Sequence, residues 1–310
     1  MLGTDTMHSF STVDVFQQAQ PNSVLAMIVG MEGPSYRPLG AVMRFFSDGS
    51  SIGTLSSGCI EADLWMHAQE ALQNYECRIL KYGRGSPFAD IQLPCGGGLE
   101  IILVPRPNEN VLSGIAEMLK DRIPVTISID FASGNLECWI DKETTRSQTG
   151  FSFRYIPEPR LIVFGKGPEA ATFTALAETL NYQNILLSPD KNTLRTVGGP
   201  SEFRQHMTAS KIPLDLKIDK WSAIILFFHD HDWEPKILHA ALKSNAFYIG
   251  AQGSQRAREE REVSVIALGA SHSDAARIKG PIGLIPSARD PRTLAVSVLA
   301  EVLKEHKDGE

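Results

Sequence analysis

Short apolar runs alternate with helical segments throughout the second half of the chain, and this alternation restricts the possible folds more than any other feature. The strand-like runs are residues 160–164, 184–187, 223–228 and 246–249. The helical segments are residues 169–180, 233–242, 254–261, 271–278 and 290–306. Strands that alternate with helices form parallel βαβ units, because a parallel connection needs a crossover. We therefore expect an α/β fold whose C-terminal part is a doubly wound, Rossmann-like parallel sheet.

The first half of the chain predicts short strands and one strong helix. Residues 23–29 and 41–46 have the apolar and β-branched character of strands. Apolar residues recur at helical spacing from Glu61 to Tyr75, which indicates an amphipathic helix. Residues 144–150 are polar and lack apolar periodicity, so we expect a loop there and a domain boundary soon after it.

The length and charge of the chain limit its class. With 310 residues it has room for two cores, and the predicted domains are residues 1–157, a small α/β domain, and residues 158–310, the Rossmann-like domain. A net charge of −6 disfavours a general nucleic-acid binder, which would normally carry a basic stripe. No apolar run approaches the roughly 20 residues that cross a bilayer, and residues 1–11 lack the pattern of a signal peptide. We therefore expect a soluble, cytoplasmic protein that binds neither nucleic acid nor membrane.

Cysteine usage indicates neither a disulfide framework nor a structural zinc site, because the cysteines are scattered and no CxxC pair occurs. The four cysteines are Cys59, Cys77, Cys95 and Cys138. Cys77 and Cys138 lie within strand-like runs and are predicted to be core residues. Cys59 and Cys95 stand beside glycines in turn-like sequence, so these two are the candidates for function.

Cys59 lies in the sequence Ser57-Gly58-Cys59-Ile60-Glu61, where the predicted helix begins. With Ser57 as the N-cap, Cys59 falls in the first turn, where the helix dipole and unpaired backbone N–H groups favour a thiolate. A thiolate is a soft ligand suited to a metal–sulfur centre. The alternative is a small buried apolar residue, which is the usual fate of a free cysteine.

Two further loops in this half are candidates for ligand contact. Cys95 precedes three glycines, beginning with Gly96 and Gly97, which suit a loop whose backbone wraps closely around an anion. The alternative is a flexible hairpin loop. Arg37 is held extended by the proline that follows it and is suited to grip a phosphate or carboxylate bidentately. The alternative is a solvated loop arginine.

The first turn of the Rossmann-like domain is similar to a dinucleotide fingerprint. Gly165 and Gly167 follow a strand and open a helix, and Asp190 ends the next strand, where a ribose-binding carboxylate belongs. However, Glu169 places a negative charge where the pyrophosphate would sit. We therefore expect NAD(P) binding to be weak or absent.

Two later strand ends in this domain are also candidates. His229 follows a strand at its carboxyl end, a favoured ligand position, while Asp230 or Asp232 is predicted to cap the next helix rather than to bind a metal. A glycine-rich turn before the following helix could cradle an anion, or could be a compact βα turn. Its candidate residues are Gly250, Gly253 and Ser254.

Several short segments together indicate a family. They are residues 33–41, 48–49, 57–61, 95–97, 165–167, 229–230, 248–256, 281–284 and 295–301. In this order and spacing they resemble the XdhC/CoxI family, the xanthine dehydrogenase accessory factors, over nearly the whole chain. The resemblance implies a small N-terminal α/β domain followed by a Rossmann-like domain. It also implies that Cys59 corresponds to the family's cofactor-associated cysteine.

The resemblance further implies a role and partners. The role is to bind molybdenum cofactor (molybdopterin) transiently, protect it during sulfuration and deliver it to a molybdoenzyme of the xanthine dehydrogenase class. A sulfur-donating cysteine desulfurase and a second copy of the chain are the other expected partners. The chain departs from the family pattern at Pro168, where a histidine is usual, and after Leu284, where an acid and a glycine are usual.

The predicted cofactor-binding residues come from the loops of the first domain and from the strand ends of the Rossmann-like domain. Cys59 is also predicted to be a metal ligand. They are Arg37, Ser57, Gly58, Cys59, Glu61, Cys95, Gly96, Gly97, Gly165, Gly167, His229, Gly250, Gly253 and Ser254. The leading hypothesis is a cofactor-binding and insertion factor without turnover of its own. One alternative is an NAD(P)-dependent oxidoreductase that uses the Rossmann-like domain. Another is a scaffold that docks a molybdoenzyme and a sulfur donor without holding cofactor.

Overall fold

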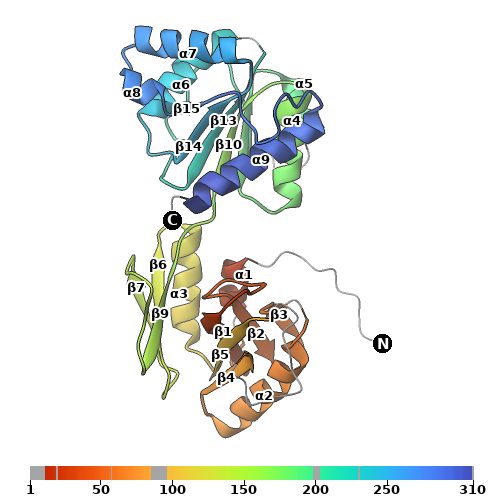
Figure 1. Cartoon of the computed structure of the whole chain (residues 1–310), viewed down its shortest axis with the longest axis vertical. Coiled ribbons are helices and arrows are strands. Elements are labelled where there is room, and N and C mark those ends of the chain that lie inside the picture. Colours follow the sequence, from red (N-terminus) through yellow and green to blue (C-terminus); the bar gives the residue numbers. More distant parts are fainter. Residues whose placement is uncertain are drawn as a thin grey trace. The chain divides into compact units, whose positions relative to one another are not determined.

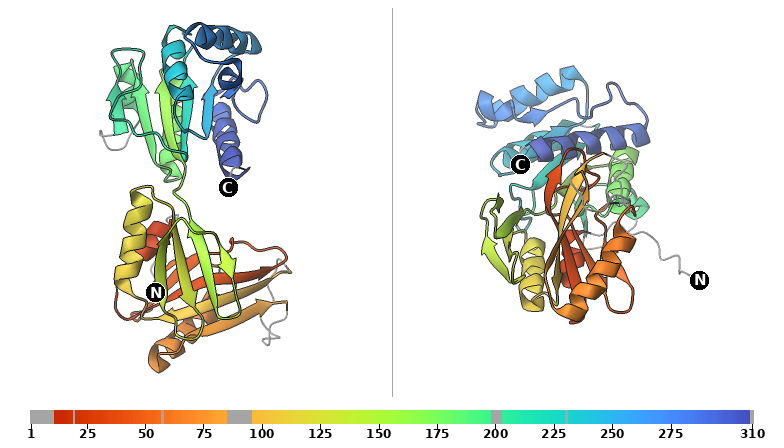
Figure 2. Two further views of the ribbon diagram at one scale, coloured as in Figure 1. Left: turned by 90° about the vertical axis from the view of Figure 1, so that its left-hand side faces the viewer. Right: turned by 60° about the horizontal axis from the view of Figure 1, so that its bottom comes forward.

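The protein is described by a computed structural model that covers residues 11–18, 20–56, 58–84, 96–197, 203–229 and 231–308. The chain divides into two compact units, Met1–Pro157 and Glu158–Glu310, which are described separately below (Figures 1 and 2). Within the described residues, no helix is both long enough and apolar enough to span a membrane.

The first sheet of unit 1 is antiparallel and has the strand order β3-β2-β1-β5-β4. Its strands are β1 (Ser23–Glu32), β2 (Val42–Phe46), β3 (Ser51–Gly53), β4 (Arg78–Gly83) and β5 (Gly98–Pro105). The central strand β1 is buried from its start through Val29, because both faces of the sheet are covered.

Helices and a second sheet cover the two faces of this sheet. Helix α2 (Glu61–Asn74) buries Leu64, Ala68 and Ala71 against one face. On the other face lie α1 (Thr12–Gln17), α3 (Glu109–Lys120) and an antiparallel sheet of order β7-β6-β9-β8. The strands of this second sheet are β6 (Val125–Asp130), β7 (Leu136–Ile140), β8 (Thr145–Arg146) and β9 (Gly150–Tyr155).

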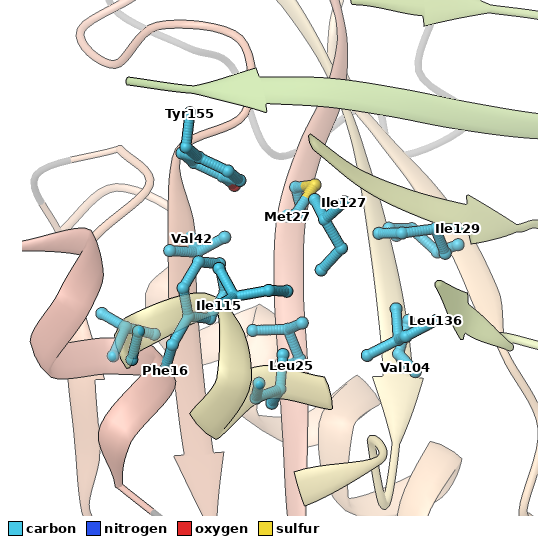
Figure 3. Packing of buried hydrophobic residues seen from close by; sticks show 14 of the residues in the cluster. Phe16, Leu25, Met27, Val42, Val104, Ile115, Ile127, Ile129, Leu136 and Tyr155 are labelled. Carbon is cyan, nitrogen blue, oxygen red and sulfur yellow. The ribbon is translucent and has the colours of Figure 1, made fainter. Parts of the chain in front are cut away.

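The core between the two sheets is continuous and apolar. Figure 3 shows Leu25 and Met27 of β1 beside Ile127 of β6, with Ile115 of α3 and Phe16 of α1 in the same cluster. Apolar side chains of this kind stabilise a fold by roughly 1.5–3 kcal/mol each when fully buried. The sheet-on-sheet packing therefore holds the loops of unit 1 on a rigid base.

The predicted loop at residues 144–150 is wrong in part, because β8 and the start of β9 lie within it. Thr145 pairs with Ser152, and Arg146 pairs with Phe151. Aromatic residues at every second position of β9 are a strand signal, which the polar residues before it obscured. The last of them, Tyr155, donates a hydrogen bond of 2.7 Å from its hydroxyl to the carbonyl of Gly40.

Unit 2 contains one parallel sheet of order β12-β11-β10-β13-β14-β15, which confirms the predicted Rossmann-like fold. Its strands are β10 (Arg160–Gly165), β11 (Asn184–Ser188), β12 (Arg204–His206), β13 (Ser222–Phe227), β14 (Tyr248–Ala251) and β15 (Ile278–Lys279). The strand order reverses direction between β10 and β13. Open α/β sheets bind ligands at this switch point, outside the carboxyl ends of the strands.

Helices cover both faces of the parallel sheet (Figure 1). Helices α4 (Pro168–Thr179) and α9 (Pro291–Asp308) pack on one face, and α6 (Glu234–Leu242) and α7 (Gln255–Ala267) on the other. The shorter helices are α5 (Lys191–Thr196), the 3₁₀ helix η2 (His231–Trp233) and α8 (His272–Ala275). The predicted helix at residues 271–278 is much shorter in the structure, where it is limited to α8. The chain then forms the edge strand β15, which begins at Ile278.

Candidate functional site

Three connections of unit 1 leave the first sheet at the same end. The end of β1 pairs with the start of β5 at Glu32 and Gly98, and the end of β4 pairs with the same Gly98. The end of β3 lies beside the start of β2, where Gly53 pairs with Met43. The 33–41 connection, the 54–60 loop and the segment that enters β5 through Gly96 and Gly97 therefore share one end of the sheet. Two predicted site residues here, Ser57 and Cys95, lie outside the described residues.

Direct contacts join the three segments. The Nε group of Arg37 donates a hydrogen bond of 3.2 Å to the carbonyl oxygen of Thr54. A side chain at Gly97 would collide with the carbonyl oxygen of Pro34, so only glycine permits this close approach. The predicted Arg37 loop thus contacts both the cysteine loop and the glycine segment. None of the described residues accepts a hydrogen bond from the Nη groups of Arg37, which remain for another partner.

The carboxylate of Glu61 organises the cysteine loop. It accepts hydrogen bonds from Thr54 Oγ1, Leu55 N, Ser56 N, Ser56 Oγ, Gly58 N and Ile60 N. Burial alone would raise the pKa of Glu61, but these hydrogen bonds outweigh it and lower the pKa from 4.5 to about 2. With its oxygens used in this way, Glu61 holds the loop in shape, and the predicted cofactor contact of Glu61 stays a prediction.

Cys59 is exposed and precedes the helix, so its predicted place in the first turn is wrong. Helix α2 begins at Glu61 and its N-cap is Ile60, not Ser57. The side chain of Ile60 is buried in the core below, which anchors the loop and leaves Cys59 at the solvent side. The backbone N–H groups expected to favour a thiolate at Cys59 are donated to Glu61 instead.

The other two described cysteines differ from Cys59 in their surroundings. Cys77 and Cys138 are partly buried and pack against the core between the sheets. Burial, together with the nearby charge of Asp130, raises the pKa of Cys77 to about 11, and burial also raises the pKa of Cys138. Both thiols are therefore protonated at neutral pH, and Cys59 is the exposed cysteine among the described residues.

A cavity of about 720 Å³ adjoins these segments between the two sheets, and Leu39 and Gly98 line it. Arg146 of β8 also lines it and donates hydrogen bonds to Glu100 and to the carbonyl of Val29. The pairing of β1 with β5 shifts register between Ile28 and Gly30. Because of this bulge, the carbonyl oxygen of Val29 can accept a hydrogen bond from Arg146. Sequence reasoning missed Arg146, because the segment that carries it was predicted to be a loop.

In unit 2, the features that resemble a dinucleotide site are used by the protein itself. Gly167, at a positive φ of 87°, donates its N–H group to Thr193 Oγ1 at 2.8 Å. Asp190 caps α5, accepting hydrogen bonds from the Thr193 hydroxyl and from the N–H groups of Asn192 and Thr193, which lower the pKa of Asp190. Gly165 packs tightly, since a Cβ there would lie 2.6 Å from the Phe227 carbonyl oxygen.

At the ends of β13 and β14, the described candidate residues serve packing or helix capping, or lack the predicted cap. Gly250 is a packing residue inside β14, since a Cβ there would lie 2.5 Å from the Tyr248 ring. Ser254 caps α7 by accepting a hydrogen bond of 3.2 Å from the Ala257 N–H group. Helix α6 has Trp233 as its N-cap, without a side-chain cap, so the predicted capping by Asp232 is wrong; Asp230 lies outside the described residues.

His229 and Glu169 approach each other at the switch point. His229 Nε2 lies 3.3 Å from Glu169 Oε2, and the His229 side chain is 62% exposed whereas that of Glu169 is 14% exposed. Behind the neighbouring β14–α7 turn, buried Arg261 forms an ion pair with Glu234 and donates to the carbonyl of Gln252. In the described part of the chain, no group of three or more histidine, cysteine or acidic side chains could hold a metal ion.

Fold and site define a two-domain α/β protein, with an exposed cysteine on an ordered loop in one unit and a Rossmann-type sheet in the other. The family model described as the XdhC and CoxI family matches residues 17–83, and the XdhC Rossmann domain model matches residues 161–302. The first match contains Arg37, Cys59 and Glu61.

Two curated relatives are similar to the chain over most of their length, and a solved structure shares its fold. The chain is 34% identical to the molybdenum cofactor insertion chaperone PaoD of Escherichia coli, over 90% of this chain and 82% of that protein. It is 25% identical to a Bacillus subtilis protein described as a probable subunit of xanthine dehydrogenase, over 97% and 98%. The crystal structure of a xanthine dehydrogenase from Bacillus halodurans shares the fold, with a TM-score of 0.76, 20% identity and 97% of each chain covered. The chain therefore belongs to the XdhC and CoxI family.

Proposed function

We propose that this protein is a chaperone that binds molybdenum cofactor and inserts it into a molybdoenzyme of the xanthine dehydrogenase class. Its relative PaoD carries the name of a molybdenum cofactor insertion chaperone, and the alignment covers most of both chains. The observation that carries the proposal is Cys59, an exposed thiol on a loop that Glu61 holds in place, inside the segment that matches the family.

The residues at this end of unit 1 suit the cofactor as a transient cargo. Molybdopterin carries a dithiolene, a pterin ring and a phosphate. Cys59 offers a soft sulfur ligand to the metal, and the Nη groups of Arg37 offer paired donors to the phosphate. Because Cys59 is exposed, the cofactor can be passed directly to an acceptor enzyme. A cysteine desulfurase as sulfur donor, a homodimeric state and a cytoplasmic location belong to the same proposal.

Co-purification tests this proposal directly. The full chain is isolated from cells that make molybdopterin and, in parallel, from cells that do not, and the fluorescence of oxidised pterin is measured per mole of protein. We expect fluorescence only in the first preparation. Equal signals from the two preparations would contradict a cofactor-binding role.

Arg37→Ala should weaken cofactor retention by about 1–3 kcal/mol, the loss typical of a charge-assisted hydrogen bond. The melting temperature should hardly change, because the part-buried side chain makes one hydrogen bond to a backbone carbonyl. Arg37→Lys is the matched control, since it keeps the charge but loses the planar fork, and it should fall between wild type and alanine. Unchanged retention in Arg37→Ala with wild-type melting would rule out the phosphate contact.

The alternative, an NAD(P)-dependent oxidoreductase, requires the Rossmann turn to hold a pyrophosphate. The Gly167 N–H group is donated to Thr193, Asp190 caps α5, and Glu169 adds a negative charge. Calorimetric titration of the full chain with NAD and NADP should therefore show no binding in the micromolar range. Micromolar affinity for either nucleotide would favour the oxidoreductase over the chaperone.

A further inference from the structure

An uncharged, exposed stripe runs along α2 and begins directly after Cys59. Ala62, Trp65 and Met66 are all exposed, and their spacing of three and four residues places them on one face of the helix. Gln69 and Gln73 continue this face, so the stripe covers about three helical turns without a charge. It lies opposite the face of α2 that packs on the first sheet. We call these five residues the α2 stripe.

The 33–41 connection adds apolar surface at the end of the sheet where the cysteine loop lies. Tyr36 is exposed, as are Pro34 and Pro38 on either side of it. The neighbouring Arg37 donates its hydrogen bond to Thr54, at the start of the loop that carries Cys59. Exposed apolar residues that occur singly are normal, whereas a group of them beside a functional side chain indicates an interaction surface.

The charges of α2 restrict the partner that fits this surface. The helix carries Glu61, Asp63 and Glu70 but neither lysine nor arginine. Glu70 is exposed beside the stripe, one turn beyond Met66, and its ion pair with Arg78 of β4 offsets one of the three acids. A second copy docked through the same stripe would set acidic side chains against acidic side chains. A partner surface with an apolar centre and a basic border complements the stripe instead.

We propose that the α2 stripe, together with Tyr36, is the surface on which the acceptor molybdoenzyme docks, through an apolar patch bordered by lysine or arginine. The inference rests on the proposed function, because the cofactor has to leave Cys59 and enter the acceptor. The acceptor must therefore contact the surface next to Cys59, and Trp65 lies about one turn into the helix that starts there. Tryptophan and methionine are enriched in protein interfaces, where apolar contacts exclude water from the centre.

Binding to acceptor enzymes tests the inference. The probes are cofactor-free molybdoenzymes of the xanthine dehydrogenase class from the organism that makes this chain, titrated calorimetrically with the full chain. Trp65→Ala should bind the acceptor about tenfold more weakly or worse, because a buried tryptophan often dominates an interface. Trp139→Ala is the matched control and should bind like wild type. Trp139 is 42% exposed and Trp65 37%, but Trp139 lies on β7, in the sheet that packs on the other face of the first sheet (Figure 1).

A pair of charge reversals tests the basic border of the partner. Glu70→Lys should slow association with the same enzyme severalfold, because charge complementarity acts mainly on the association rate. Glu137→Lys, which reverses an exposed acid of β7, makes the same change in net charge and should leave the association rate near that of wild type. Equal slowing by the two reversals would reflect net charge alone and would contradict docking on α2.

Retention and self-association separate the inference from its alternatives. Trp65→Ala should keep the melting temperature and the molybdopterin content of wild type, because the inference gives Trp65 no contact with the cofactor. Wild-type affinity of Trp65→Ala for the acceptor, or loss of its molybdopterin, overturns the inference. Dissociation of a dimer into monomers in Trp65→Ala, measured by sedimentation, would assign the stripe to a second copy and overturn it as well.

The same measurements distinguish this inference from the proposed function. A wild-type chain that carries molybdopterin but binds none of the enzymes supports the proposed function and overturns the inference. Docking that depends on Trp65, without co-purified molybdopterin, supports the inference alone and contradicts the proposed function.

Discussion

Cys59→Ser should remove most of the molybdopterin that co-purifies with the protein while changing its melting temperature by no more than about 2 °C. Serine is nearly the same size as cysteine, but its hydroxyl is not a soft ligand for a metal–sulfur centre. Because Cys59 is exposed, the substitution removes little buried contact. Bound molybdopterin per mole of folded protein is measured by pterin fluorescence, with thermal melts of the same samples.

The other cysteines provide the controls for this experiment. Cys77→Ser and Cys138→Ser should retain cofactor as long as they fold, because these thiols pack against the core and burial keeps them protonated. Cys95→Ser should be intermediate if its loop lines the same site. Wild-type retention in Cys59→Ser would exclude the thiolate ligand, and the segment at Gly96–Gly98 would then be the better candidate for the contact.

The fold was predictable from the sequence where apolar periodicity was strong. The alternation of strands and helices after residue 160 predicted the parallel sheet of unit 2, because buried parallel strands need continuous apolar runs. The hairpin strands β8 and β9 were missed, since β8 is polar and exposed and is defined only by its pairing with β9. Helix α5 was missed for a similar reason, because its six residues are set by the Asp190 cap rather than by periodicity.

The candidate site was predictable in its residue types but not in its hydrogen bonding. Asp190 does follow a strand at the expected distance, yet a threonine three residues later turns it into a local cap. Glu61 was predicted to be a cofactor-binding residue; its hydrogen-bond partners lie before it in the chain, and only the folded loop shows that its carboxylate faces them. Short-range patterns identify a polar group, whereas its partner is decided by tertiary packing.

Glu61→Ala should destabilise the protein by about 3 kcal/mol and speed the alkylation of Cys59 under native conditions. The substitution removes the acceptor of four backbone N–H groups and two hydroxyls. Unpaired buried donors cost about 1–3 kcal/mol each, but the total is smaller than their sum because an opened loop exposes several of them to water. Cofactor retention should fall as well, since Cys59 is no longer held in place. Chemical unfolding and iodoacetamide kinetics measure the two effects.

The pH dependence separates this positioning role from general destabilisation. The pKa of Glu61 is lowered from 4.5 to about 2 in the folded protein, so the stability that its charge contributes is present above pH 4.5 and lost as the pH falls toward 2. The stability difference between wild type and Glu61→Gln should therefore be largest at neutral pH and shrink through that range.

Glu76→Gln, at an exposed carboxylate just beyond the other end of α2, should match wild type in stability and in Cys59 alkylation at neutral pH. A wild-type alkylation rate in Glu61→Ala would show that Cys59 is positioned by other contacts, such as the hydrogen bond from Arg37 to Thr54.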